Sequence, residues 1–438
     1  MLERKIQLSI RKYFSLNNDK ILIVDGARQI GKSYIIRHEG KAAFKNYVEI
    51  NMIEDRDGDR LFADINGVED FYIRLSSFAG KRLGNKQNTL VFLDEIQAYP
   101  KMLTLLKFLC DDNRFTYIAS GSLLGIALHK TLSVPGGRIM IEHMYPLDFE
   151  EFLWANNVGV DVVEHLRRQF HDKKSIAEGL HRRILDLFKT YLLIGGLPQA
   201  VNTYLESQNI YNVRKIHEEI LNLYKEDASQ YSIVEKLKIR RVFDLIPSNM
   251  ENRKKRLHFN KVENEDGKAA RDYDDEIEYL ISAGVALDVR AISNPMFPLI
   301  ASARKNLLKL YLNDVGLLSH VLFRNNVAAI KDDHLSINLG SVYETVVATE
   351  LMAHGHPLFY YDNKKKGEVD FLIDDFDSLS ILPVEVKSGR DYNIHRAIDR
   401  FVTNPEYKVK NAVVLSNEPE VVVKGTTYYF PIYYVMFL

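Results

Sequence analysis

Two stretches of the 438-residue chain combine residue types that handle phosphate chemistry. Near the start, "GARQIGKS" at residues 26–33 follows the apolar run "ILIVD". Near the end, "LPVEVKSGR" at residues 382–390 places Glu385 and Lys387 two apart among apolar neighbours. A glycine-rich loop can turn backbone N–H groups toward phosphate oxygens, and an acid beside a lysine can hold a metal ion and orient a water molecule. Each stretch must be positioned by the elements around it.

The first stretch has the spacing G-x-x-x-x-G-K-[ST] between a predicted strand and a predicted helix. The run "ILIVD" is typical of a buried parallel strand, and "YIIRHE" after the loop can continue as a helix. In this context the motif predicts a phosphate-binding loop for ATP. Lys32 would reach the β- and γ-phosphates, and the Ser33 hydroxyl would ligate Mg²⁺. The expected cofactor-binding residues of the loop are Gly26, Ala27, Arg28, Gln29, Ile30, Gly31, Lys32 and Ser33.

A second apolar strand, "TLVFLDEIQAYP", ends in two adjacent acids. Asp94 can hold Mg²⁺ through water, and Glu95 can polarise the water that attacks the γ-phosphate. In isolation the same pair is an ordinary strand end, but its place after a phosphate-binding loop favours the catalytic interpretation. The helical pattern "KMLTLLKFLCDD" and the strand "RFTYIASGS" follow. Ser120 or Ser122 would face the γ-phosphate as a sensor, or would belong to a polar turn.

The composition bounds the class of protein. Its hydrophobic fraction of 46% and charged fraction of 27% are those of a globular protein, and the length suggests two to four domains. A net charge of −1 argues against a globally basic nucleic-acid binder. The single cysteine, Cys110, excludes an internal disulfide framework. The charged amino-terminal stretch has no apolar core of a signal peptide, and no apolar run is long enough to span a bilayer, so a cytoplasmic location is expected.

The middle of the chain is expected to form two modules after the 1–150 core. Residues 151–235 show helical spacing and predict a helical lid that closes with nucleotide, interrupted at "GGLP" (195–198) by a hinge or helix break. Residues 236–300 read as helices followed by a strand pair, the order of a winged helix. This module holds a basic cluster that could contact DNA phosphates or simply face solvent. The cluster consists of Arg253, Lys254, Lys255, Arg256 and Lys261 around Phe259.

Residues 301–438 predict a separate α/β domain. Glu344 lies on an amphipathic helix, and Asp370 alternates with apolar residues on a strand. On the next strand Glu385 and Lys387 point to one face. An exposed, self-paired strand face is the alternative interpretation of such a Glu-x-Lys pair.

The motifs resemble two known families. "GARQIGKS", "VFLDEIQ", "YIASGSLLG", "GGRIMIEHMYPLDFEEFL" and "YLLIGGLPQAV" are similar to prokaryotic AAA-type P-loop ATPases fused to a carboxyl-terminal domain of unknown function. This resemblance implies an α/β fold with an additional-strand parallel sheet. It also implies an arginine finger at Arg138, which would act on a neighbouring subunit of a homo-oligomer; an arginine that only opens a strand is the alternative.

The four residues of the last domain resemble the PD-(D/E)xK restriction-endonuclease-like fold. The resemblance implies that Asp370 and Glu385 bind Mg²⁺, that Glu344 adds a carboxylate, and that Lys387 helps deprotonate the attacking water.

Two functions follow from these predictions. In the first, Mg²⁺-dependent ATP hydrolysis is coupled to a nuclease-like domain that binds or cuts DNA, with RNA as a less favoured substrate. In the second, the chain is a nucleotide-dependent switch or scaffold that binds a protein partner, and the nuclease-like fold is catalytically silent. Neither function involves a membrane.

Overall fold

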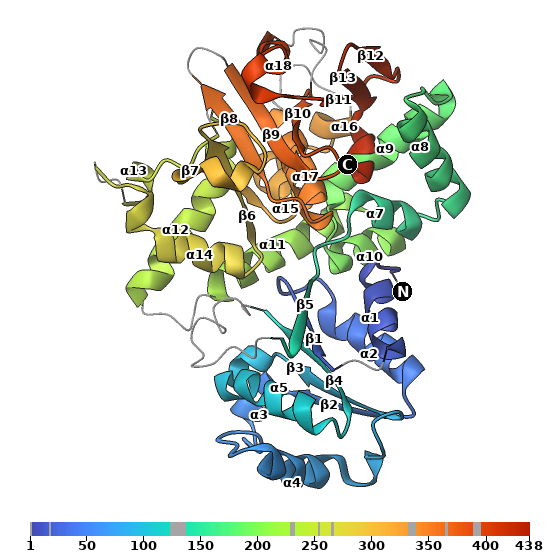
Figure 1. The fold of residues 1–438 in the computed structure, drawn as a ribbon, viewed down its shortest axis with the longest axis vertical. Coiled ribbons are helices and arrows are strands. Elements are labelled where there is room, and N and C mark those ends of the chain that lie inside the picture. Colours follow the sequence, from blue (N-terminus) through green and yellow to red (C-terminus); the bar gives the residue numbers. More distant parts are fainter. Residues whose placement is uncertain are drawn as a thin grey trace. The chain divides into compact units, whose positions relative to one another are not determined.

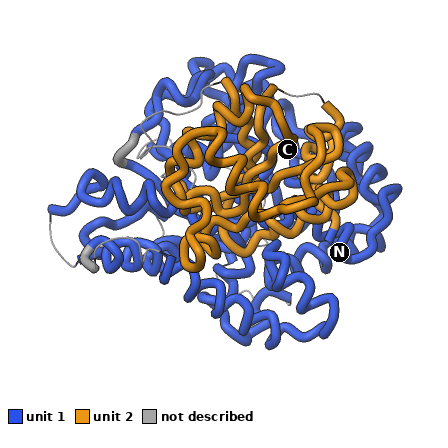
Figure 2. The backbone as a smooth tube through the Cα atoms, turned by 90° about the horizontal axis from the view of Figure 1, so that it is seen from below, with its two compact units in different colours: residues 1–2, 146–281, 285–438 blue, residues 3–145, 282–284 orange. Residues whose placement is uncertain are grey.

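The computed structural model of the chain consists of two compact units, drawn in Figures 1 and 2. The amino-terminal unit spans Glu3–Tyr145 with Ser282–Gly284, and the carboxyl-terminal unit holds the remainder. The described residues are 2–16, 19–122, 137–227, 233–252, 255–263, 267–331, 339–363, 367–388 and 396–438. Within them, no helix combines the length and the apolar character needed to cross a bilayer.

The amino-terminal unit alternates strands and helices, as the sequence pattern predicts. Its helices are α1 (Ile6–Ser15), α2 (Lys32–Ala43), α3 (Met52–Asp57), α4 (Val68–Ala79) and α5 (Pro100–Asp112), with 3₁₀ turns η1 (Gly80–Arg82) and η2 (Ile96–Ala98). Its strands are β1 (Ile21–Asp25), β2 (Asn46–Asn51), β3 (Thr89–Asp94), β4 (Thr116–Gly121) and β5 (Ile139–His143). The predicted strands at 21–25 and 89–94 and the predicted helices after them are confirmed.

All five strands are parallel and lie in the order β2-β3-β4-β1-β5. The strand β4 therefore separates β1, which leads into the glycine loop, from β3, which ends in Asp94. This is the additional-strand arrangement that the resemblance implies. Because parallel strands end at the same edge, the carboxyl ends of β1, β3 and β4 bring the loop, the two acids and Ser120 together. One face of the sheet packs on α4 and α5 in a core that includes Ile23, Val91 and Leu106.

The carboxyl-terminal unit begins with a series of helices. They are α7 (Phe149–Ala155), α8 (Val160–Asp172), α9 (Glu178–Ile194), α10 (Pro198–Ser207), α11 (Ile210–Glu226), α12 (Ile233–Met250), α13 (Asn260–Glu263) and α14 (Asp274–Ser282), with the 3₁₀ turn η4 (Ala270–Asp272). The predicted helical character of 151–235 is confirmed for the described residues 151–227 and 233–235, and α9 ends before the "GGLP" stretch as expected.

The glycines of that stretch lie in a tightly packed junction. A Cβ on Gly196 would lie 2.0 Å from the carbonyl oxygen of Leu147, and the Gly196 N–H donates to the buried carboxylate of Asp314 at 2.6 Å. The glycine is thus required for close backbone approach.

The rest of the unit is built around an eight-stranded mixed sheet, in the order β12-β13-β11-β10-β9-β8-β6-β7. The strands are β6 (Ala286–Ile292), β7 (Ala303–Leu312), β8 (Phe359–Asn363), β9 (Gly367–Asp375), β10 (Ser380–Val386), β11 (Ala412–Ser416), β12 (Val422–Lys424) and β13 (Thr427–Pro431). The helices are α15 (Val315–Phe323), α16 (Ala328–Lys331), α17 (Gly340–Ala353) and α18 (Arg396–Val402), with 3₁₀ turns η5 (Leu299–Ser302), η6 (Pro405–Tyr407) and η7 (Ile432–Phe437). The helix predicted to carry Glu344 is α17, and the strands predicted to carry Asp370 and Glu385 are β9 and β10.

The strand pair expected in the 236–300 module belongs to this sheet. The strand β6 pairs with β7 in an antiparallel hairpin, after the helices α12 to α14, but β6 also pairs in parallel with β8. The hairpin is therefore not a free-standing wing. The expected domain boundary at residue 300 falls between β6 and β7, two strands that hydrogen-bond to each other. The sequence could not show this, because the pairing of two strands leaves no sign in the local periodicity of either one.

Candidate functional site

The glycine loop between β1 and α2 has the backbone that its sequence requires. Gly26 and Gly31 adopt φ values of 144° and 93°, and Gln29 has a φ of 66°. A Cβ on Gly26 would lie 2.2 Å from the carbonyl oxygen of Met144, so only glycine fits there. Gly31 immediately precedes α2, whose first residue is Lys32. The N–H groups of the loop thus lie at the amino end of a twelve-residue helix. Phosphate binds favourably there, because the free N–H groups and the helix dipole both attract an anion.

Lys32 is buried and directed at the loop itself. Its Nζ donates to the carbonyl oxygens of Gly26 at 2.8 Å and Ala27 at 2.7 Å. Burial lowers the pKa of this ammonium group, and nearby carboxylates, Glu95 first, oppose that shift. The Lys32 hydrogen bonds go to neutral carbonyl groups, so its charge remains available to an anion.

Asp94 is the centre of a hydrogen-bonded cluster at the ends of β3 and β4. The Ser33 hydroxyl donates to Asp94 Oδ1 at 2.9 Å, and the Ser120 hydroxyl donates to the same oxygen. Burial raises the pKa of Asp94, and these two hydroxyl hydrogen bonds oppose the shift. Ser33 and Asp94 are 61 residues apart, and together they offer the hydroxyl and carboxylate oxygens that Mg²⁺ prefers.

Glu95 is held in a second set of contacts. Its φ of 53° is a left-handed conformation that turns the chain away from β3 into η2. The Gln97 side-chain amide donates to Glu95 Oε2 at 2.5 Å and to the Ser122 hydroxyl at 3.2 Å, while Ser122 lies 3.3 Å from Glu95 Oε2. Arg28 Nε lies 3.5 Å from Ser122 Oγ. Ser120 and Ser122 therefore contact different acids.

Sequence reasoning missed two residues near this site. Gln97 was not predicted, although its position two residues after Glu95 in a tight turn was the available signal. His143 at the end of β5 pairs with Asp25, the last residue of β1, with 3.2 Å between Nδ1 and Oδ2. This hydrogen bond raises the pKa of the His143 imidazole. No sequence signal linked these two residues, since they meet only through strand pairing.

The four predicted residues of the last domain also meet. Asp370 on β9 and Glu385 on β10 are on neighbouring strands, and α17, which carries Glu344, packs on β10. Lys387 Nζ donates to Glu385 Oε1 at 2.6 Å, and the Val386 N–H donates to Asp370 Oδ2 at 2.9 Å. The second oxygen of Glu385 is buried and has no hydrogen-bond partner among the described residues.

Two further lysines pair with acids among or beside these residues. The acid–lysine cluster is defined here as Glu344, Glu368, Asp370, Glu385, Lys255, Lys309 and Lys387. Lys255, 89 residues before Glu344, forms an ion pair with Glu344 Oε1. Lys309 on β7 has a side chain only 1% exposed and pairs with Glu368 at 2.7 Å. Neither lysine was predicted, because both lie far along the chain from the motif.

The charges of the cluster shift one another's pKa values. Burial and the nearby carboxylates of Glu385 and Glu344 raise the pKa of Asp370 well above its usual range. Burial raises the pKa of Glu385 as well, against the effect of Lys387. At Glu344 burial also acts to raise the pKa, but the ammonium groups of Lys255 and Lys309 outweigh it, and the pKa is lowered.

Comparison with known families assigns the amino-terminal site. Residues 18–153 match the family model described as "AAA domain". The amino-terminal unit is an AAA-type P-loop domain. Residues 185–328 and 339–435 match two models described as domains of unknown function, DUF8612 and DUF4143. No curated protein matches the chain.

Several solved structures are similar to the chain at low sequence identity. The Walker-type ATPase paby2304 of Pyrococcus abyssi is 15% identical, with 73% of this chain and 95% of that chain covered and a TM-score of 0.43. RuvB of Thermotoga maritima is 16% identical, with 65% and 87% covered and a TM-score of 0.30. Cdc6p from Pyrobaculum aerophilum is 12% identical, with 76% and 96% covered and a TM-score of 0.26. The assignment of the AAA domain depends on the family match and the site, not on these scores.

Arg138 lies at the opposite edge of the AAA sheet from the P-loop. It directly precedes β5, and its carbonyl accepts from the N–H of Ile21 at the start of β1. Its guanidinium pairs with Asp111 at 2.7 Å and Asp19 at 3.7 Å. Arg138 therefore does not reach the nucleotide site of its own chain, and action on a neighbouring subunit remains a prediction. The preceding residues of its motif, Pro135 and Gly136, lie outside the described residues.

Two described cations of the basic cluster at 253–261 are paired with acids of the same chain. Lys255 pairs with Glu344, and Arg256 pairs with Asp362 and donates to the Tyr360 hydroxyl at 2.8 Å. Phe259 stacks on Tyr273, whereas Lys261 is exposed. Arg253 and Lys254 lie outside the described residues. Lys255 and Arg256 thus have their charges paired with acids of the carboxyl-terminal unit.

The two predicted metal sites differ in their ligands: Ser33 and Asp94 in the AAA domain, and the three carboxylates of Glu344, Asp370 and Glu385 in the carboxyl-terminal unit. Across the part of the chain that the structure describes, no group of three or more His, Cys, Asp and Glu side chains is arranged to hold a metal ion. The AAA site does not need such a group, since Mg²⁺ in a P-loop takes one or two protein ligands and completes its shell with phosphate and water oxygens. Ser33 and Asp94 fit that requirement.

Proposed function

We propose that the protein is a Mg²⁺-dependent ATPase whose AAA domain controls a partner-binding carboxyl-terminal unit. The loop N–H groups and Lys32 would bind the phosphates of ATP, and Ser33 with Asp94 would hold Mg²⁺. Bound there, Mg²⁺ neutralises charge that develops on the transferring phosphoryl group. Glu95 would orient and polarise the attacking water, while Gln97 and Ser122 keep its carboxylate in place.

The ATPase proposal depends above all on the position of Ser33 relative to Asp94. The Ser33 hydroxyl and Asp94 Oδ1 lie 2.9 Å apart, although they come from separate motifs, and Lys32 is the adjacent residue on the loop. A metal-binding pair beside a phosphate-binding lysine is what ATP hydrolysis requires.

The test is ATP hydrolysis by the full chain with and without Mg²⁺. Wild type should release phosphate only with Mg²⁺, and Lys32→Ala should lose activity by a factor on the order of 10²–10³. Lys41→Ala, which removes an exposed lysine of the same helix, is the matched control and should keep the wild-type rate. Equal rates in wild type and Lys32→Ala would reject the ATPase proposal.

For the carboxyl-terminal unit we favour binding over cutting. Lys255, Lys309 and Lys387 already balance most of the negative charge that a cutting site would offer to a metal ion. Such a unit would serve as a nucleotide-controlled switch or scaffold for a protein partner or for DNA.

Phosphodiester cleavage is the second candidate for this unit. It is favoured by the unpartnered buried oxygen of Glu385, which lies beside Asp370 and Lys387. Mg²⁺-dependent DNA cutting that disappears in both Asp370→Ala and Lys387→Ala would establish it. DNA binding with a steep salt dependence and no cutting would instead support a DNA-binding switch. Capture of a defined protein without DNA affinity would support the scaffold.

A further inference from the structure

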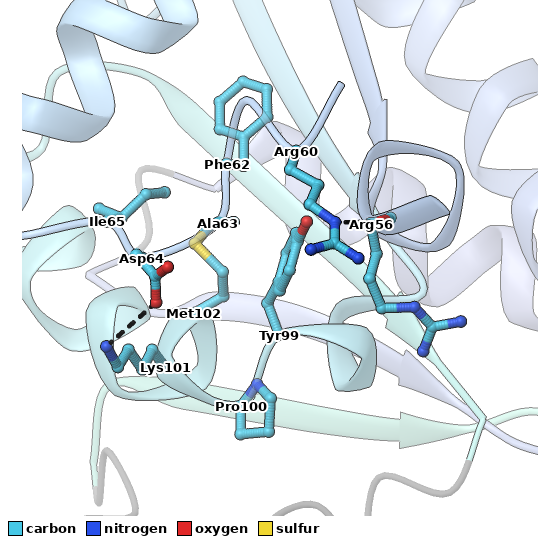
Figure 3. Close-up of a pocket in the computed structure, with 10 residues that line it drawn as sticks. All are labelled: Arg56, Arg60, Phe62, Ala63, Asp64, Ile65, Tyr99, Pro100, Lys101 and Met102. Atoms are coloured by element: carbon cyan, nitrogen blue, oxygen red, sulfur yellow. Dashed lines mark hydrogen bonds and ion pairs between the residues drawn. The ribbon is translucent and has the colours of Figure 1, made fainter. Parts of the chain in front are cut away.

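A pocket of 400 Å³ lies in the AAA domain outside the residues proposed to bind ATP. It is lined by two short segments, residues 56–65 after β2 and residues 99–102 after β3 (Figure 3). Its volume is in the range of sites that hold one or two large side chains or a small ligand. The proposed function leaves this pocket unexplained.

The pocket combines an apolar floor with a basic rim. Phe62 and Met102 are each 1% exposed and belong to the core that packs on the sheet. Arg56, Arg60 and Lys101 are exposed around this floor, against a single lining acid, Asp64. A ligand that fits must therefore present an apolar group to the floor and negative charge to the rim.

Arg60 is the rim cation best placed for an anion. Arg56 pairs with Asp57 at 3.0 Å, and Lys101 lies 3.6 Å from Asp64. Arg60 donates through Nε to the Arg56 carbonyl oxygen, and its two terminal nitrogens have no partner among the described residues. In Figure 3 its guanidinium lies next to the Tyr99 side chain.

Hydrogen bonds with several side chains hold the wall of the pocket. Both Arg60 and Asp64 adopt left-handed backbone conformations, with φ values of 56° and 54°, which cost energy in non-glycine residues. The Asp55 carboxylate holds this loop by accepting from the N–H groups of Leu61 at 2.9 Å and Phe62 at 3.0 Å. It also accepts from the Tyr99 hydroxyl at 2.9 Å.

From the other side, Arg74 donates to the carbonyl oxygens of Leu61 at 2.8 Å and Ala63 at 2.6 Å. A wall already fixed in this way loses little conformational entropy when a ligand binds.

Both walls continue directly into the nucleotide site. Tyr99 follows η2, the single turn that begins after Glu95 and contains Gln97. The other wall begins with α3, which is capped by Asn51 of β2, the residue paired in register with Asp94. A ligand that moves Tyr99 or α3 therefore acts on the acids that would hold Mg²⁺ and orient the attacking water.

We propose that this pocket binds an acidic, apolar segment of a partner protein, which inserts a large apolar side chain onto Phe62 and Met102 and places a carboxylate on Arg60. Occupancy changes the rate of ATP hydrolysis through Tyr99 and η2. The binding part is independent of the proposed ATPase, whereas the rate change depends on it.

The experiment measures binding of a fluorescein-labelled nine-residue peptide that alternates Glu with Leu and Phe, by fluorescence anisotropy with the full chain. Affinity should fall at least tenfold in Arg60→Asn, which removes the cation while asparagine tolerates the left-handed backbone. It should fall similarly in Lys101→Glu and for a matched peptide with Gln in place of Glu. Lys107→Glu reverses an exposed charge two turns further along α5 and should bind like wild type.

The outcomes separate the two proposals. Binding in Lys32→Ala should equal wild type, so a failed ATPase leaves the pocket testable on its own. Peptide binding that persists unchanged in Arg60→Asn and Lys101→Glu, or no peptide binding at all, overturns the pocket proposal. Loss of binding of a labelled single-stranded DNA in these variants, with no affinity for the peptide, would also overturn it and assign the pocket to nucleic acid. In wild type the peptide should change the ATP hydrolysis rate at least twofold, and an unchanged rate at saturation overturns the coupling.

Discussion

The AAA site and the acid–lysine cluster use the same residue types in opposite ways. In the AAA domain, Lys32 donates to backbone carbonyl groups and Asp94 accepts from serine hydroxyls. In the carboxyl-terminal unit, lysines donate to carboxylates, as Lys387 does to Glu385. In the first arrangement the lysine and the aspartate are bound to neutral groups, whereas in the second the lysines are paired with carboxylates of the same chain.

This difference teaches that residue identity does not decide whether a site is available for chemistry. A buried carboxylate needs a positive partner, and either a metal ion or a lysine of the same chain can supply it. Where the lysine is itself buried, as Lys309 is, its ion pair forms as the chain folds and is part of the folded structure.

The largest expected effect is on the rate of ATP hydrolysis when the charge of Glu95 is removed. In Glu95→Gln the amide cannot polarise the attacking water, so ATP hydrolysis should fall by a factor on the order of 10²–10⁴. ATP binding, measured by calorimetry with Mg²⁺, should remain within a few fold of wild type. An unchanged rate would show that another group activates the water. Gln97→Ala should give a smaller loss, because it only positions Glu95.

The second prediction concerns the buried lysine of the cluster. Lys309→Met leaves acids without their buried cation and should lower the free energy of unfolding by about 3–5 kcal/mol in urea denaturation. Lys255→Met, at a side chain 13% exposed, should cost less. The double variant Lys309→Met with Glu368→Met should recover part of the loss, since it removes the ion pair as a whole. Equal losses in the two single variants would contradict a special role for burial.

The third prediction is a pH dependence carried by Asp370. Its pKa is raised in the folded state, so the folded protein binds more protons than the unfolded chain as the pH rises above about 4. Stability of the carboxyl-terminal unit should therefore fall as pH rises through that range, and Glu385 contributes with the same sign. Urea unfolding between about pH 4 and 8 should show this slope in wild type and a weaker slope in Asp370→Asn. Stability that rises with pH over the range, or an identical slope in the variant, would contradict the prediction.

The smallest effect is expected at Arg138. Its ion pair with Asp111 is partly exposed, so Arg138→Ala should cost about 0.2–1 kcal/mol of stability. The ATP hydrolysis rate per chain should not change if each chain works alone. A rate loss on the order of 10³-fold that depends on protein concentration would instead establish Arg138 as an arginine finger between subunits.

The sequence by itself determined the parts of this protein that depend on local spacing. A glycine loop between an apolar strand and a helix has few conformations open to it, so the positions of Gly26, Lys32 and Ser33 followed from the motif. Strand and helix periodicity likewise placed Asp94, Asp370 and Glu385 at strand positions where the structure has them.

Only the tertiary structure decided which charges meet. Lys255 and Glu344 are 89 residues apart, and Lys309 reaches Glu368 through the packing of a separate strand; neither contact leaves a periodic signal. The same holds for the pocket between residues 56–65 and 99–102, which exists because two neighbouring parallel strands end at one sheet edge. Local spacing sets what a segment can become, whereas pairing between distant segments sets which of its charges remain available for a ligand.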